Sequence, residues 1–140
     1  MFFKYNNQNY IATCNDEDSI KVFDFKGNKI KEINDSKDSA FFIDIYYDNN
    51  LFKNYIITGN EGYAKSYEYN VNKLYHKYSE NDNIKGHMSI IINKKKEIIK
   101  LIESCCDGNI RIWNFHSGIL LKKIKVSNEG LREICMWNNE

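Results

Sequence analysis

His87, Ser104 and Asp107 supply the three residue types of a hydrolytic triad within one stretch of the sequence. In such a triad the histidine takes the proton of the serine hydroxyl, and the aspartate orients the histidine. The G-x-S-x-G turn that exposes a nucleophilic serine does not occur in the sequence. Ser104 lies in an apolar run instead. We therefore predict no catalytic residue and no enzyme activity in this chain.

The residue spacings that are typical of metal and cofactor sites are also missing from the sequence. The four cysteines are Cys14, Cys105, Cys106 and Cys135, and no two of them form a C-x-x-C pair. No histidine lies at zinc-finger spacing from them, and His76 and His116 have no partner at ligand spacing. No phosphate-binding glycine loop or paired-carboxylate pattern occurs. We predict no metal and no cofactor, and we interpret Cys14, Cys105 and Cys135 as reduced core residues.

Charge and hydropathy exclude two further classes of partner. The formal net charge is +1, and the basic run Lys94–Lys96 is short and lies between predicted strands. Aromatic residues make up 14% of the chain, but most recur at matched positions of a repeat, which is typical of a core and not of base stacking. The sequence has no run of about 18 apolar residues. We predict no nucleic acid and no membrane partner, and a cytoplasmic or nuclear location.

Residues 101–114, LIESCCDGNIRIWN, indicate the element that must position these side chains. Two β-rich stretches flank the Asp107-Gly108 turn, which is the pattern of a hairpin. The same phrase recurs at 10–25 and 55–69. Aromatic residues end the three copies at intervals of 44 and 46 residues: Phe23, Tyr67 and Trp113. A repeat of roughly 40–45 residues with a tight turn predicts the blades of a β-propeller.

The third copy, in which Gly86-His87 stands 26 residues before Trp113, resembles a blade of the WD-repeat β-propeller family. The resemblance implies a buried structural network of polar side chains at His87, Ser104, Asp107 and Trp113. Such a network must be fully satisfied to be tolerated in a core. The first two copies have no histidine at the blade entrance, and Glu17 and Glu61 replace the turn aspartate. We therefore expect a complete network in the third blade only, and apolar packing in the other two.

The alternating pattern divides the single domain, residues 1–140, into blades at approximately 1–34, 40–79 and 88–126. Residues 131–137 are predicted to start a further blade. The predicted fold is all-β, a partial β-propeller of three four-stranded antiparallel blades plus one extra strand. Closed propellers typically use 4–8 blades, so three leave edges open to self-association. The chain ends within a repeat, which favours a propeller fragment. An open arc and a ring completed by another chain remain alternatives.

The family resemblance implies a non-catalytic scaffold for protein–protein interaction. The alternative is the targeting propeller of a larger enzyme, of the kinase or ubiquitin-ligase kind, whose catalytic domain lies outside this chain. Turns on one face carry an excess of carboxylates: Asp16, Glu17, Asp18, Asp35, Asp38, Glu61, Glu80 and Asp82. Turns on the other face carry lysines: Lys26, Lys29, Lys53, Lys73 and Lys94–Lys96. We predict that other proteins bind the acidic face through basic segments.

Overall fold

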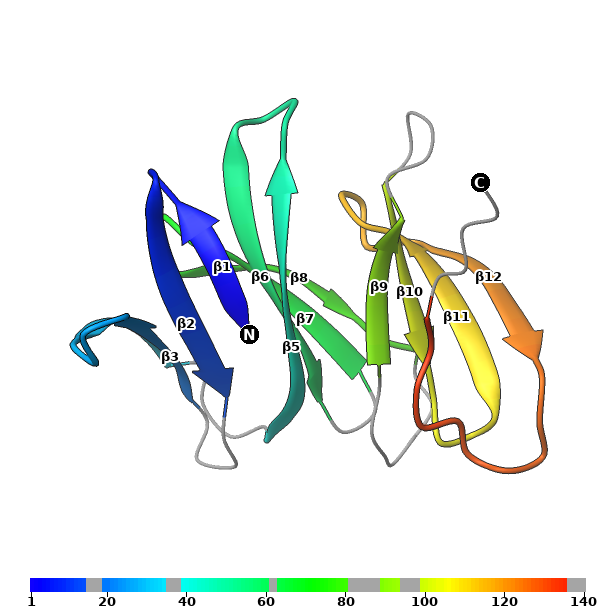
Figure 1. Ribbon diagram of the computed structural model, residues 1–140. Helices are drawn as coiled ribbons and strands as arrows, with labels where there is room; N and C mark the ends of the chain where they lie inside the picture. Colours follow the sequence, from blue (N-terminus) through cyan, green and yellow to red (C-terminus); the bar gives the residue numbers. More distant parts are fainter. Residues whose placement is uncertain (15–18, 35–38, 61–62, 81–88, 94–98, 136–140) are drawn as a thin grey trace, which may run out of the picture.

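The computed structural model describes residues 1–14, 19–34, 39–60, 63–80, 89–93 and 99–135, and only the backbone of 89–93. Within these ranges the chain is all-β and forms three four-stranded antiparallel sheets, which Figure 1 shows side by side. The described residues contain no helix long and apolar enough to cross a membrane. The predicted all-β class and four-stranded antiparallel blades are confirmed.

Each sheet is a meander whose strand order follows the chain. The first sheet contains β1 (Phe2–Tyr5), β2 (Gln8–Cys14), β3 (Ser19–Asp24) and β4 (Lys29–Asn34). The second contains β5 (Ala40–Asp48), β6 (Lys53–Asn60), β7 (Tyr63–Glu68) and β8 (Lys73–Tyr78). The third contains β9 (Ser89–Asn93), β10 (Lys100–Ser104), β11 (Asn109–Asn114) and β12 (Leu120–Lys125).

The tight turn at 105–108 forms as the sequence predicts. Ser104 pairs with Ile110 and Leu101 pairs with Trp113, which makes 100–114 an antiparallel hairpin. Gly108 has a φ of +74°, a backbone conformation that side chains with a Cβ rarely adopt. A Cβ on Gly108 would also lie 2.0 Å from the carbonyl oxygen of Ser127. Both the conformation and the close approach require glycine at this turn.

Two apolar cores lie between the three sheets, and the second sheet contributes to both. Tyr55 and Ile57 pack toward the third sheet, whereas Ile56 and Tyr67 pack toward the first. Accordingly, the four central residues of β7 are all buried. In β3 and β11 buried residues alternate with half-buried ones, because each of these strands has a neighbouring sheet on one face only.

The predicted extra strand at 131–137 is not formed over its described part. Residues 131–135 have no strand pairing, and 136 and 137 lie outside the described residues. The backbone after β12 is bonded to the tight turn instead. The N–H groups of Val126 and Ser127 donate to the Gly108 carbonyl, and that of Leu131 donates to the Cys105 carbonyl. Of these three donors, Leu131 lies in the predicted strand, so its N–H is no longer available for strand pairing.

Candidate functional site

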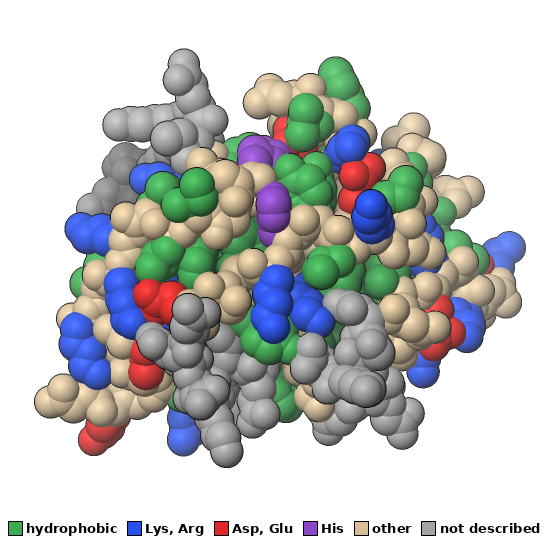
Figure 2. Space-filling view, turned by 180° about the vertical axis from the view of Figure 1, so that it is seen from behind, with side chains coloured by type: hydrophobic (Ala, Val, Ile, Leu, Met, Phe, Trp, Pro, Cys, Tyr) green, Lys and Arg blue, Asp and Glu red, His purple; other side chains and the backbone are tan. Residues whose placement is uncertain are grey.

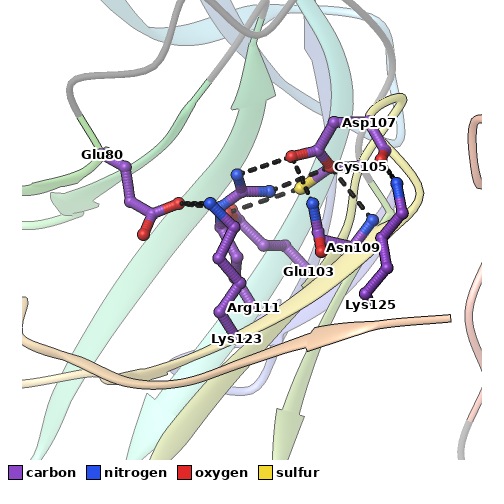
Figure 3. Close-up of polar contacts among 8 residues, drawn as sticks. All are labelled: Glu80, Glu103, Cys105, Asp107, Asn109, Arg111, Lys123 and Lys125. Atoms are coloured by element: carbon purple, nitrogen blue, oxygen red, sulfur yellow. Dashed lines mark hydrogen bonds and ion pairs between the residues drawn. The ribbon is translucent and has the colours of Figure 1, made fainter.

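Arg111 is the centre of a polar cluster at the tight turn of the third sheet (Figure 3). Its side chain is only 1% exposed, although it carries a full charge. The guanidinium donates Nε to Glu80 Oε2 at 2.7 Å, and Nη1 and Nη2 to the two carboxylate oxygens of Asp107 at 3.2 and 2.7 Å. Lys123 Nζ also donates to Glu80, at 2.8 Å. Two carboxylates from different segments thus satisfy a buried cation, as such burial requires.

Asp107 closes the tight turn as well as pairing with Arg111. Its carboxylate accepts hydrogen bonds from the backbone N–H of Asn109 at 3.0 Å and from Asn109 Nδ2 at 2.7 Å. Partial burial acts to raise the pKa of Asp107, but the hydrogen bonds from Arg111 and Asn109 outweigh burial and lower this pKa well below its usual range. The turn therefore keeps a permanently ionised carboxylate.

Glu103 lies directly opposite Arg111 in the β10–β11 pairing and was not singled out by the sequence analysis. Its side chain is 2% exposed, and its Oε1 lies 3.8 Å from Cys105 Sγ, which donates to it. Burial raises the pKa of Glu103 to about 7 and that of Cys105 to about 12. The Cys105 thiol is therefore protonated and buried, which is the state of a structural cysteine.

The predicted contact between Ser104 and Trp113 is not formed. Ser104 Oγ and Trp113 Nε1 are both buried, and Ser104 Oγ has no hydrogen-bond partner in the described part of the chain. The Trp113 indole acts on Glu103 instead, since it lowers the pKa of that carboxyl against the effect of burial. The pairing register gives the reason: Trp113 lies opposite Leu101, and Leu101 and Ser104 point to opposite faces of the sheet. Glu103, one residue earlier, shares the tryptophan's face. His87 lies outside the described residues, so the four-residue network stays a prediction.

A second polar cluster joins the second and third sheets at their turns. Asp48 is buried at the β5–β6 turn, and its Oδ2 lies 3.1 Å from Nε2 of His116 in the β11–β12 turn. Tyr75 Oη lies 3.1 Å from the other ring nitrogen of His116. His76 Nε2 bonds to the His116 carbonyl. This carboxylate–imidazole–phenol chain fixes two turns that are far apart in the sequence.

Comparisons with known proteins address the fold. No family model matches the sequence, and no curated protein matches it. The structure is similar to the crystal structure of the WD40 β-propeller domain of Doa1, with a TM-score of 0.75 and 16% identity over 94% of this chain. The chain therefore has the fold of a partial β-propeller. Its three sheets are blades, and the chain covers 42% of the Doa1 chain.

A second solved structure agrees with this fold. The computationally designed Ika4 protein is similar with a TM-score of 0.72 and 15% identity, over 98% of this chain and 78% of that chain. Identities this low concern the fold alone. The predicted resemblance to WD-repeat blades is therefore confirmed at the level of the fold.

The three blades share a pattern of charged residues before the aromatic residue, which is visible in the sequence but did not enter the predicted site. A basic residue stands two positions before each blade's aromatic residue, at Lys21, Lys65 and Arg111. A carboxylate precedes each of these by four residues, at Glu17, Glu61 and Asp107. The structure shows Arg111 bound to Asp107, whereas Glu17 and Glu61 lie outside the described residues. Because this spacing recurs in all three blades, it could have indicated Arg111 as a site residue from the sequence.

One end of the propeller displays apolar side chains on its turns. Alternate turns of a meander share an end, and the contacts of Asp48 with His116 and of Tyr5 with Asn70 bring turns of different blades together. We call the exposed apolar residues of these turns the turn-tip surface: Leu51, Phe52, Val71 and Ile119. Figure 2 shows hydrophobic side chains beside the two described histidines on the back of the molecule.

Of the eight residues of the predicted acidic face, only Glu80 is described. The seven outside the described residues are Asp16, Glu17, Asp18, Asp35, Asp38, Glu61 and Asp82. The Glu80 carboxylate is bound to Arg111 and Lys123, so it serves the interior of the third blade. On the other face Lys53 pairs with Glu68 at 2.9 Å. The acidic face stays a prediction.

Proposed function

We propose that this chain is a non-catalytic scaffold for protein–protein interaction and that its turn-tip surface contacts the partner. The fold supports an interaction module at a general level, since propellers present many turns on a rigid frame. The Arg111 guanidinium is bound by Glu80 and Asp107, and Lys123 also binds Glu80. This pairing of charges stabilises the third blade.

Phe52 is the observation that carries this proposal. Its ring is 77% exposed at the tip of the β5–β6 turn, where folding gains little from an aromatic side chain. Its φ of +52° lies in the left-handed region, which a bulky residue seldom occupies. A strained, solvent-exposed aromatic side chain on a turn is typical of a binding residue.

The test compares the partner proteins that wild-type and variant full-length chains bind in cells that make this protein. Phe52→Asp keeps a residue that tolerates the left-handed conformation but removes the exposed ring. Val126→Asp is the matched control, because Val126 is an exposed apolar residue at the other end of the third blade. We expect the partner to be lost with Phe52→Asp and kept with Val126→Asp, as quantified by mass spectrometry. An identical set of retained proteins for Phe52→Asp and wild type would refute the proposal.

We also propose a cytoplasmic location for the scaffold. No disulfide joins the cysteines of the described residues, and cysteines of proteins in a reducing compartment stay in this state. Fluorescence microscopy of the tagged full-length protein tests this directly, and a signal confined to a secretory compartment would contradict it.

A further inference from the structure

The turns at one end of the propeller share a backbone feature, and the β5–β6 turn departs from it in residue type. We call this end, which carries the turn-tip surface, the turn-tip end. The described turns β1–β2, β3–β4, β7–β8 and β11–β12 each contain a residue of positive φ, which is asparagine or glycine: Asn6, Asn7, Gly27, Asn72 and Gly118. These two residue types tolerate the left-handed region well. The β5–β6 turn places Phe52 in this region instead, so turn geometry does not account for the aromatic ring.

Two contacts hold the turn of Phe52 against its neighbours. The Asp48 carboxylate lies 3.1 Å from His116 Nε2, which joins the β5–β6 turn to the β11–β12 turn. Lys53 Nζ donates to Glu68 Oε2 at 2.9 Å, which joins the base of the β5–β6 turn to the base of the β7–β8 turn. The three turns therefore form one surface, on which four apolar side chains are each more than half exposed: Leu51, Phe52, Val71 and Ile119.

The described carboxylates of the turn-tip end are engaged within the chain. Asp48 is bound to His116 and Glu68 to Lys53, as above. Asp24 lies in the β3–β4 turn, where its carboxylate accepts hydrogen bonds from the backbone N–H groups of Lys26 and Asn28 at 2.9 Å. Asn28 Nδ2 also donates to it, at 2.9 Å. These carboxylates stabilise their own turns, so they are poorly placed to bind a cationic ligand.

Lysines at the same end are not engaged in this way. Three exposed lysines form no ion pair with a carboxylate of the described residues: Lys4, Lys26 and Lys73. Lys73 follows Val71 by two residues in the β7–β8 turn. Tyr5 Oη donates to Asn70 Oδ1 at 2.9 Å, and this bond brings the β1–β2 turn and Lys4 beside the same turn. Figure 2 shows Lys and Arg side chains next to hydrophobic ones near the two described histidines.

We infer that the partner of the turn-tip surface is an acidic protein segment that also carries apolar side chains. This inference rests on the proposed function and names the chemistry of its partner. The apolar side chains of the segment would cover Phe52 and its apolar neighbours, and its carboxylates would pair with the three lysines. A basic segment would meet lysines of like charge, which opposes binding. An uncharged segment would desolvate the lysines without supplying a partner for them.

Exposed apolar side chains surrounded by lysines would also suit an anionic membrane, but the polar groups between the tips favour a protein segment. The His116 side chain is 34% exposed, and it lies between the turns of Phe52 and Ile119. Ser117 and Asn72 are exposed on the tips as well. Hydrocarbon offers these groups no hydrogen-bond partner, whereas a polypeptide backbone can donate to them and accept from them.

Display of random peptides of about 12 residues on the immobilised full chain tests the inference without a choice of charge in advance. We expect the enriched peptides to combine Asp or Glu with Leu, Ile or Phe. Fluorescence anisotropy of the enriched peptides then measures affinity. Phe52→Asp should weaken binding about tenfold or more, and Lys73→Gln about threefold. Lys122→Gln is the matched control, because Lys122 is an exposed lysine in the middle of β12, and it should leave the affinity unchanged.

The outcomes separate the inference from the proposed function. Enriched peptides that need Phe52 but are basic or uncharged would overturn the acidic chemistry and leave the scaffold proposal intact. Equal losses for Lys73→Gln and Lys122→Gln, or no enriched peptide that needs Phe52, would also overturn the inference. In each case the comparison of Phe52→Asp with wild type in cells decides the scaffold proposal by itself.

A membrane is a further outcome of the test. Sedimentation of the full chain with vesicles of phosphatidylcholine and phosphatidylserine, abolished by Phe52→Asp, would assign the surface to a membrane and overturn the inference. We expect no sedimentation with these vesicles. Circular dichroism verifies that each variant is folded, and because Phe52, Lys73 and Lys122 are exposed, we expect unchanged spectra.

Discussion

The second and third blades share one backbone plan but hold their interiors together with different chemistry. In the second blade a neutral pair is buried: Ser66 Oγ and Tyr78 Oη lie 3.0 Å apart, and Tyr78 Oη donates to the Phe115 carbonyl at 2.7 Å. In the third blade isoleucines occupy the positions of Ser66 and Tyr78, and the buried position of Lys65 holds Arg111 between two carboxylates. The comparison shows that the repeat specifies the register of the strands and leaves the polar interior free to vary.

This difference between the two blades should affect how their stability responds to substitution. Buried neutral hydroxyls need one partner each, whereas a buried guanidinium must be matched in charge as well as in hydrogen bonds. The third blade should therefore respond strongly to single charge removals and to pH. The second blade should respond mainly to changes in packing, because apolar residues cover both of its faces.

Replacing Arg111 should cause the largest loss in this comparison. Arg111→Met keeps much of the side-chain volume but leaves Asp107 and Glu80 without their shared cation. Breaking a buried ion pair from one side costs about 3–5 kcal/mol, and we expect a loss in that range in the free energy of unfolding by urea titration. Lys29→Met, which removes an exposed pair with Glu32, is the control and should cost less than about 1 kcal/mol. Equal losses would show that the cluster contributes no more than a surface pair.

Ile57→Ala and Ile102→Ala compare packing at matched positions of the two blades. Ile57 is fully buried between blades, and its truncation should cost about 3 kcal/mol. Ile102 is half-buried in the third blade, so we expect its truncation to cost about 1 kcal/mol. Urea unfolding at low protein concentration measures both values. A larger loss at Ile102 would reverse the predicted order of the blades.

Glu103 should make the stability of the third blade depend on pH. Its pKa is raised to about 7 in the folded chain from 4.5, so the folded state binds more protons than the unfolded state between these values. The free energy of unfolding should therefore fall as pH rises from about 4.5 to 7, by on the order of 3 kcal/mol. Glu103→Gln should remove this slope in urea titrations at several pH values. An unchanged slope would assign it to another group.

Trp113→Phe and Tyr67→Phe should give the smallest effects. The Ser104 hydroxyl has no hydrogen-bond partner in the described residues, so the Trp113 variant loses packing area and the indole's interaction with Glu103 but no bond to Ser104. We expect each substitution to cost about 1 kcal/mol or less in the free energy of unfolding. A loss of about 3 kcal/mol for Trp113→Phe alone would indicate that the indole donates within the predicted network after all.

The fold was predictable because the repeat is visible in the sequence. The hairpin pattern at 101–114 and its two earlier copies predict the strands, the turns and the pairing register. The structure confirms the hairpin at 101–114, whose turn has Gly108 at a positive φ. The polar site was less predictable. Ser104 and Glu103 are neighbours in one short run, and a shift of one residue in a strand moves a side chain to the other face.

Contacts between blades could not be read from the sequence. Asp48 and His116 are 68 residues apart, and nothing in the pattern of either turn indicates that they meet. The strand predicted at 131–137 failed for a related reason. Alternation of apolar residues gives a segment the pattern of a strand, but pairing also needs free backbone groups, and at Leu131 the N–H is already bonded to Cys105.

The burial of both faces of the second blade has a kinetic consequence. Its hairpins are local in sequence and can form early, but a sheet with two apolar faces gains stability only when a neighbour covers it. We therefore expect a transition state in which the second blade is docked against one neighbour, with the remaining blade added afterwards. In hydrogen exchange, amides of β6 and β7 should then open only in global unfolding, whereas those of β4 and β12 should exchange through smaller openings.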